Sequence, residues 1–338
     1  MNTVLEVNNL TVDIVDRRQR VTALDDVSLT LHAGETLAVV GESGCGKSLT
    51  ALALMRLLPA PAVCIGGGEI WFERQNLATL SEGKMRRLRG RRLAMIFQDP
   101  MSSLNPVKTV GDQLSEVLRV HLGLSRREAW RRGTELLEQV HIPDASRRML
   151  EYPHRLSGGM SQRVMIAIAI ACKPAVLIAD EPTTALDVTI QAQILALLRE
   201  LQADTGMALM LITHDLGVVA AMAQRVAVMY AGKKVEEAPV LELFDHPLHP
   251  YTQGLLRATP TSGQPNQRLL DIPGRVPALS ELPAGCAFAD RCLHVSAQCR
   301  RQRPALETLR RDHQASCWAA QQDASTAVLR LANGGRRA

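Results

Sequence analysis

The chain has 338 residues, a hydrophobic content of 46%, a charged content of 22% and a formal net charge of +5 at pH 7. This balance is that of an ordinary globular protein with room for one large domain or two modest ones. The small positive charge and the aromatic content of 3% favour no nucleic-acid partner.

Neither the interior nor the start of the chain has a pattern typical of a membrane-targeted segment. The longest apolar run, Val164 to Cys172, is much shorter than the ~20 residues that cross a bilayer. Met1 to Leu10 lack a basic segment followed by an apolar core, so we expect no secretory signal and a cytosolic location.

Apolar and polar side chains alternate in the N-terminal segment, about residues 1–80. Val4, Leu5, Val7 and Leu10 belong to this pattern. A period of two residues predicts antiparallel strands that lead into the next feature of the chain.

Residues Gly41 to Ser48 read Gly-Glu-Ser-Gly-Cys-Gly-Lys-Ser, which is a complete phosphate-binding loop. The loop follows the apolar run Thr36 to Val40 and precedes a segment of helical composition. Backbone N–H groups of such a turn and of the following helix cradle anions. We expect Lys47 to reach the β- and γ-phosphates and Ser48 to bind Mg²⁺. The predicted nucleotide-binding residues are Gly41, Ser43, Gly44, Cys45, Gly46, Lys47, Ser48 and Leu49.

Downstream, residues 107–155 have the apolar spacing of helices, and from 156 to 235 helices and strands alternate. This alternation predicts a mainly parallel sheet. The expected elements are helices near 160–172 and 188–203 and strands near 175–180 and 207–213. Prolines multiply after about residue 245, which indicates a boundary near 245–260.

The apolar strand ending at Asp180 is followed directly by a second carboxylate, Glu181. Asp180 is expected to hold Mg²⁺, and Glu181 to polarise the attacking water near the γ-phosphate. Taken alone, the pair has an alternative interpretation as an acidic helix cap after a buried strand.

Leu156 to Arg163 read Leu-Ser-Gly-Gly-Met-Ser-Gln-Arg, and this segment resembles the signature sequence of ABC-transporter ATPases. The family most often has Gln where Met160 stands. Ser157, Gly158 and Gly159 leave a helix N-terminus whose N–H groups can face a phosphate. In this family, that phosphate belongs to ATP held by the opposite subunit.

The resemblance implies roles for three further positions. Gln98 matches the loop glutamine that senses Mg²⁺ and contacts the membrane subunit, and His214 matches the switch histidine that hydrogen-bonds the γ-phosphate. Asp187, in Ala185-Leu186-Asp187, matches the loop that crosses the dimer interface. The implied catalytic residues are thus Glu181, His214 and Gln98, and the implied Mg²⁺ ligands are Ser48, Gln98 and Asp180.

One departure from the family concerns the adenine base. The family usually supplies an aromatic residue that stacks on adenine, but Asp13 to Asp25 contain none. Arg18 lies near the expected place, and a guanidinium can stack on a base, so Arg18 is the candidate.

Four of the seven cysteines crowd into the last sixth of the chain, at Cys286, Cys292, Cys299 and Cys317. Such crowding in a cytosolic protein favours a metal over disulfides. The spacing does not fit paired C-x-x-C zinc ribbons, while four thiolates can bind a [4Fe–4S] cluster or Zn²⁺. Free thiols are the other alternative.

The C-terminal segment resembles the peptide/nickel importer subfamily of ABC ATPases. Its shared features are His249 to Thr252, the turn Pro273 to Pro277 and the Gly-Cys cluster that begins at Cys286. In some relatives this cluster carries [4Fe–4S]. Because the sequence shows no redox partner chemistry, we expect a structural role in ordering the proline-rich tail and not electron transfer.

The resemblance implies an α/β fold, that of a P-loop ABC ATPase. Its parts would be a mainly parallel core sheet, an N-terminal antiparallel β subdomain, a helical subdomain near residues 100–160 and a small irregular metal-binding extension. The implied domains are residues 1–250 and 251–338.

The implied function is to bind and hydrolyse ATP for an importer of oligopeptides or a related small solute. The partners would be a similar but distinct ATPase, two transmembrane permeases and an extracytoplasmic solute-binding protein, at the cytoplasmic face of a bacterial inner membrane. The alternatives are a soluble ABC-type ATPase acting on ribosomes or DNA, an exporter ATPase, and an iron–sulfur regulatory protein with a nucleotide site.

Overall fold

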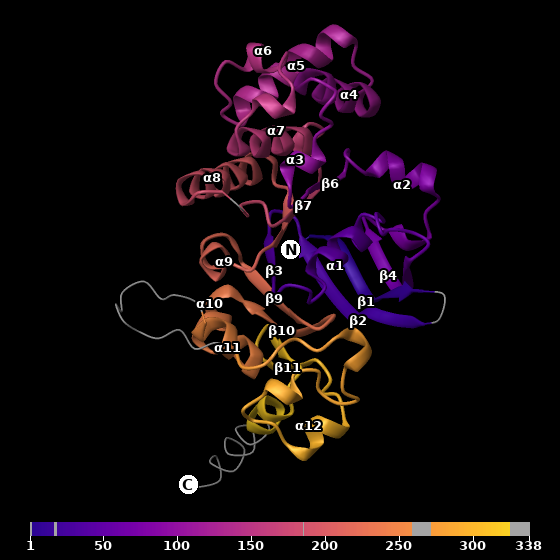
Figure 1. Ribbon diagram of the computed structural model, residues 1–338, viewed down its shortest axis with the longest axis vertical. Coiled ribbons are helices and arrows are strands. Elements are labelled where there is room, and N and C mark those ends of the chain that lie inside the picture. The colour runs from indigo at the N-terminus through magenta and orange to yellow at the C-terminus, as the bar shows by residue number, and fades with distance from the viewer. Residues whose placement is uncertain (1, 17–18, 185, 259–271, 325–338) are drawn as a thin grey trace.

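The computed structural model describes residues 2–16, 19–184, 186–258 and 272–324 (Figure 1). Two sheets occupy the middle of the molecule, a layer of helices lies at one end, and the C-terminal segments lie at the other (Figure 1). None of the described helices is long and apolar enough to span a bilayer.

The N-terminal sheet is antiparallel, with strand order β2-β1-β4-β5. Its strands are β1 (Thr3–Val15), β2 (Arg20–His32), β4 (Val63–Phe72) and β5 (Gln75–Asn76). Side chains such as Leu5, Val7, Leu10 and Val12 are buried. The alternation predicted from the sequence is confirmed here.

The core sheet has eight strands in the order β11-β12-β10-β9-β3-β8-β7-β6. They are β3 (Thr36–Val40), β6 (Leu93–Ile96), β7 (Val176–Asp180), β8 (Ala208–Ile212), β9 (Arg225–Tyr230), β10 (Lys233–Pro239), β11 (Glu307–Arg310) and β12 (His313–Ala315). The strands from β9 to β6 are parallel, as predicted, and the remaining pairs are antiparallel.

Helices cover both faces of β3. Leu37 and Val39 belong to the core cluster that includes Leu54 of α1, while Ala38 and Val40 belong to the cluster that includes Val219 of α9. A strand buried on both faces is apolar throughout, and all five residues of β3 are buried. The helices are α1 (Lys47–Leu54), α2 (Glu82–Leu88), α3 (Pro100–Ser103), α4 (Val110–Leu122), α5 (Arg126–Gln139), α6 (Ala145–Arg148), α7 (Gly158–Ile170), α8 (Val188–Thr205) and α9 (Leu216–Met222).

The C-terminal segment is more regular than predicted. It contains α10 (Val240–Asp245), α11 (Pro250–Arg257), α12 (Ala297–Arg301) and the β11–β12 hairpin. Strand β12 pairs with β10, so the hairpin extends the core sheet. The buried His313 contacts the buried Glu236 of β10 at 2.7 Å and fixes this docking. Strands of three and four residues are too short to show an alternating pattern in the sequence. This explains why the extension was predicted to be irregular.

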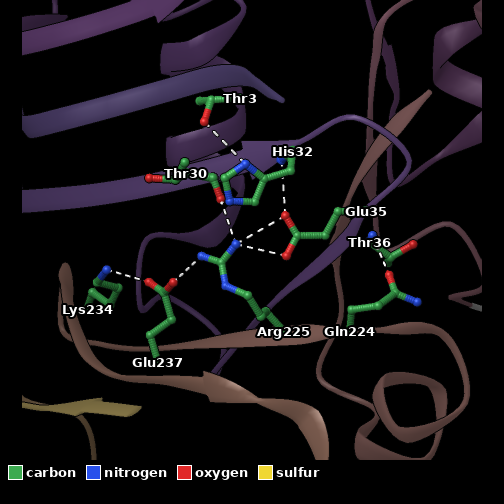
Figure 2. Close-up of polar contacts among 9 residues, drawn as sticks. All are labelled: Thr3, Thr30, His32, Glu35, Thr36, Gln224, Arg225, Lys234 and Glu237. Atoms are coloured by element: carbon green, nitrogen blue, oxygen red, sulfur yellow. Dashed lines mark hydrogen bonds and ion pairs between the residues drawn. The ribbon is translucent and has the colours of Figure 1, made fainter. Parts of the chain in front are cut away.

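A cluster of ion pairs fixes the start of β3 against its neighbours (Figure 2). The Arg225 guanidinium donates to Glu35 at 2.8 Å and also pairs with Glu237, which in turn accepts from Lys234. The Thr36 N–H donates to the Gln224 side chain at 2.6 Å. These contacts join the turn before β3 to β9 and β10, so the strand is anchored at the end opposite its phosphate-binding loop.

Candidate nucleotide-binding site

The loop between β3 and α1 has the backbone geometry of an anion cradle. Gly41 has φ 152° and Gly46 has φ 104°, values that favour glycine. A Cβ atom on Gly41 would lie 2.2 Å from the Met229 carbonyl oxygen. Lys47 Nζ donates to the carbonyls of Gly41 at 2.8 Å and Glu42 at 3.0 Å, so the loop curls around its ammonium.

Most of the predicted loop residues border a cavity of about 310 Å³. It is lined by Ser43, Gly44, Gly46, Lys47, Ser48 and Leu49, together with Gln98, which follows β6, and Glu181, which follows β7. Gly41 and Cys45 do not line it. The Cys45 thiol is buried in the core beneath the loop, and this burial raises its pKa, so Cys45 contributes packing and its backbone rather than a reactive sulfur.

A hydroxyl and a carboxylate meet at the position predicted for Mg²⁺. Ser48 Oγ donates to Asp180 Oδ1 at 3.1 Å. Burial raises the pKa of Asp180, the Ser48 hydrogen bond offsets part of this, and the Glu181 charge adds to it. A hard cation that prefers oxygen ligands would relieve the unfavourable burial of this charge. These residues therefore fit Mg²⁺.

Glu181 is oriented by Thr184 of its own loop and by Gln98 and His214 from two other segments. Its carboxylate accepts from Gln98 Nε2 and Thr184 Oγ1, both at 2.9 Å, and lies 3.2 Å from His214 Nδ1. Glu181 has φ 46°, a strained value for a non-glycine residue, and its N–H donates to the Ile212 carbonyl at 2.9 Å. The structure thus brings Gln98, Glu181 and His214 together.

The environment of Glu181 keeps its carboxylate charged. Burial raises its pKa, but hydrogen bonds from Thr184 and His214 outweigh burial and hold the pKa below its usual range. The group is therefore ionised at neutral pH, as a carboxylate that polarises water must be.

The signature residues lie apart from this cavity. Ser157 caps α7 by accepting from the Met160 N–H at 3.4 Å, and Ser157 and Gly158 are exposed. Asp187, also exposed, caps α8 by accepting from the Ile190 N–H at 2.9 Å. None of them lines the cavity. These residues shape the N-termini of α7 and α8 on the surface.

Three aliphatic side chains that line the cavity were missed by sequence reasoning. They are Ile14 of β1, Ala23 of β2 and Leu279, which begins the short 3₁₀ helix η3 (Leu279–Glu281). Aliphatic side chains have no stacking group that would mark them in the sequence as contacts of a base, and Leu279 lies far along the chain from Ile14 and Ala23. Arg18 and Ala185 lie outside the described residues.

The four C-terminal cysteines border one small cavity of about 20 Å³. Burial raises the pKa of Cys286 to about 11, and the neighbouring Cys299, Cys317 and Cys292 raise it further. Among the described residues, no group of three or more His, Cys, Asp and Glu side chains is arranged to hold a metal ion. A metal-binding extension is therefore still a prediction.

Family comparisons agree with this geometry. The family model described as ABC transporter matches residues 24–184, and the one described as oligopeptide/dipeptide transporter, C-terminal region, matches residues 235–299. A Brucella melitensis protein named "Putative peptide import ATP-binding protein" is 50% identical over 325 residues, covering 93% of this chain and 96% of the relative. The chain belongs to the ABC transporter family.

This ABC ATPase has further relatives of known name and structure. A Sinorhizobium fredii protein named "Probable peptide ABC transporter ATP-binding protein" is 51% identical over 315 residues, covering 93% of this chain and 94% of the relative. A dimeric ATP-binding cassette bound to ADP and Pi in a post-hydrolysis state is 26% identical, with a TM-score of 0.62, covering 70% of this chain and 98% of that one. The cbiO1 protein of Clostridium perfringens, part of an ABC transporter complex, is 27% identical, with a TM-score of 0.61, covering 73% and 92%. Membership of this family implies ATP and Mg²⁺, which the loop, Ser48 and Asp180 fit.

Proposed function

We propose that this ABC ATPase hydrolyses ATP to power the import of oligopeptides or a related small solute. One observation carries the solute class: the chain joins an ATPase region to a region matched by the oligopeptide/dipeptide transporter C-terminal model, and its relatives carry names of peptide import. The proposed division is an ATPase domain at residues 1–250, with its helical subdomain near 100–160, and an extension at 251–338.

The residues of the cavity have distinct roles in this proposal. Lys47 and the loop N–H groups bind the β- and γ-phosphates, and Ser48, Asp180 and Gln98 hold Mg²⁺ directly or through water. A bound Mg²⁺ would supply positive charge that neutralises the phosphate oxygens. Glu181 accepts a hydrogen bond from the attacking water. His214, whose Nδ1 lies 3.2 Å from the Glu181 carboxylate, donates a hydrogen bond to the γ-phosphate.

The exposed signature helix supports a sandwich of two ATPases. Ser157 and Gly158 present the N-terminus of the 13-residue α7 to the surface, where its N–H groups can bind the phosphate of ATP held by another subunit. The proposed partner is a similar but distinct ATPase. Two permeases and an extracytoplasmic solute-binding protein complete the importer at the cytoplasmic face of the inner membrane.

Purification of the tagged chain from native membranes in mild detergent, followed by mass spectrometry, tests this assembly. We expect two multi-span permeases and a second ATPase, and uptake of labelled peptides that requires this chain. Cells carrying Glu181→Gln should keep the complex but lose uptake. Recovery of ribosomal or DNA-bound proteins instead of permeases would contradict the proposal.

The finer proposal for the extension is that its four cysteines hold a metal, with a [4Fe–4S] cluster preferred over Zn²⁺. Its support is the shared cavity and the His294 N–H that donates to Cys292 Sγ at 3.4 Å, because such bonds stabilise thiolate ligands. Cys292→Ser should lower the iron and sulfide content of anaerobically purified protein and the melting temperature, with ATP binding retained. The control is Cys64→Ser, outside the cluster. Unchanged metal content and stability in Cys292→Ser would reject a bound metal.

A further inference from the structure

The extension reaches the phosphate-binding loop through one arginine. Arg291 ends the short 3₁₀ helix η4 (Ala289–Arg291) and forms a two-point ion pair with Glu42, the second residue of the loop. The distances are 2.6 Å from Nη1 to Oε2 and 2.9 Å from Nη2 to Oε1. The Arg291 side chain is only 5% exposed and the Glu42 side chain is 29% exposed, so the guanidinium is shielded from water and the carboxylate is partly buried.

Other contacts hold the guanidinium in one orientation. Arg291 Nε donates to the Pro273 carbonyl at 2.9 Å, and Nη1 donates to the Tyr230 hydroxyl at 3.4 Å. The guanidinium also lies 5.8 Å from the ring centroids of Tyr230 and Phe288. A planar, preorganised guanidinium is suited to binding a carboxylate at two points.

A second group of the C-terminal segment holds the same loop residue by its backbone. The Glu42 N–H donates to the hydroxyl of Tyr251 in α11 at 2.8 Å, and Tyr251 is fully buried. The Glu42 carbonyl accepts from Lys47 Nζ at 3.0 Å. Glu42 is thus fixed at its carboxylate, N–H and carbonyl, and the first two contacts come from beyond residue 250.

The charge of Glu42 is unfavourable for the task of the loop. A carboxylate on a loop that receives a triphosphate repels the incoming anion, and poor screening at a partly buried site enlarges that repulsion. We propose that Arg291 is a positioning residue that masks the charge of Glu42, so that the C-terminal extension is a working part of the ATP site. This inference rests on ATP binding at the loop and is independent of the transported solute.

Calorimetric titration of the full chain with ATP in EDTA, which prevents hydrolysis, tests the inference. Arg291→Gln leaves the Glu42 charge unmasked and should weaken ATP binding by about tenfold. The double variant Glu42→Gln/Arg291→Gln loses the ion pair but also the repelling charge, so its affinity should return to within about threefold of the wild type. Raising the salt concentration should shrink the defect of the single variant.

The double variant separates charge masking from mere scaffolding. If the ion pair only held the extension in place, the double variant would bind ATP as weakly as Arg291→Gln, and this result would overturn the proposal. Unchanged affinity in Arg291→Gln would overturn it too. The matched control is Arg300→Gln, which breaks the exposed pair with Asp290 and should leave ATP affinity unchanged.

A third variant keeps the test decisive if Arg291→Gln does not fold. Glu42→Gln retains the cation and removes the repulsion, so it should bind ATP at least as tightly as the wild type. Weaker binding by Glu42→Gln would count against the proposal.

Discussion

Similar polar residues lie near the two ends of β3, but their electrostatic settings are opposite. At the start of the strand, Glu35 and Glu237 flank Arg225 (Figure 2). Burial by itself would raise the pKa of Glu237, but Lys234 and Arg225 outweigh burial and lower it. Beyond the other end of the strand, burial beside Glu181 raises the pKa of Asp180.

The difference separates an anchor from a reaction site. Paired charges stabilise the fold, whereas two adjacent carboxylates concentrate negative charge that favours a bound cation. We therefore expect substitutions at the first cluster to change stability and substitutions at the second to change chemistry.

Glu181→Gln should have the largest effect. The amide keeps the size of the side chain but cannot polarise water as a carboxylate does, so steady-state hydrolysis should fall by at least ~100-fold while ATP binding persists. Phosphate release measured beside an ATP titration checks both parts. The control Glu138→Gln, at an exposed position of α5, should hydrolyse ATP normally. Near-normal turnover in Glu181→Gln would remove Glu181 from this role.

Glu237→Gln should break the anchor. It leaves Arg225 and the buried Lys234 without a shared anion, so the free energy of unfolding should drop by about 2–3 kcal/mol at pH 7. Because the folded-state pKa of Glu237 is lowered, its contribution is present at neutral pH and is lost as pH falls through that pKa. The stability difference measured in urea should therefore shrink in acid.

The control for this variant is Glu135→Gln, which breaks exposed pairs with Arg131 and Arg132. Such pairs contribute less than about 1 kcal/mol. Equal losses in the two variants would show that the cluster at β3 is not a special anchor.

Asp180→Asn should act in the opposite sense on stability. A raised folded-state pKa means that the charged form of Asp180 is disfavoured in the folded protein at neutral pH, and that this penalty disappears as pH falls. The amide should therefore stabilise the nucleotide-free protein by roughly 1 kcal/mol, a rise of a few degrees in melting temperature. Added Mg²⁺ and ATP should then stabilise the variant less than the wild type. A lower melting temperature would contradict this assignment.

The core sheet and the phosphate-binding loop were predictable because their signals are local. An apolar strand, a glycine-rich turn and a helix occupy consecutive residues at 36–54, and Asp180 with Glu181 follow directly on β7. The family resemblance implied roles for Gln98, Glu181 and His214, and parallel strands that end at one edge explain why the three side chains meet.

The contacts of the extension were not predictable from the same kind of pattern. Arg291 and Tyr251 carry no local signal for Glu42, because nothing near them in sequence indicates a loop more than 200 residues earlier. The docking of the β11–β12 hairpin on β10 likewise includes a buried pair, His313 with Glu236, that no periodicity in the sequence indicates.

Leu279→Ser should give the smallest effect. It distinguishes the two contacts of the extension with the ATP site, one through Leu279 and the other through Arg291. Leu279 lines the cavity with Ile14, which is 38% exposed. We expect these side chains to pack on the base of the nucleotide, where the family uses an aromatic ring. Losing part of that apolar contact should weaken ATP binding about threefold.

Inorganic tripolyphosphate sharpens this last comparison, because it has no base. Leu279→Ser should bind tripolyphosphate as the wild type does, whereas Arg291→Gln should bind both ligands more weakly. Leu293→Ser, at an 80% exposed position of the same extension, serves as the control and should change neither affinity. If Leu279→Ser weakened tripolyphosphate and ATP equally, Leu279 would act on the phosphate loop and not on the base.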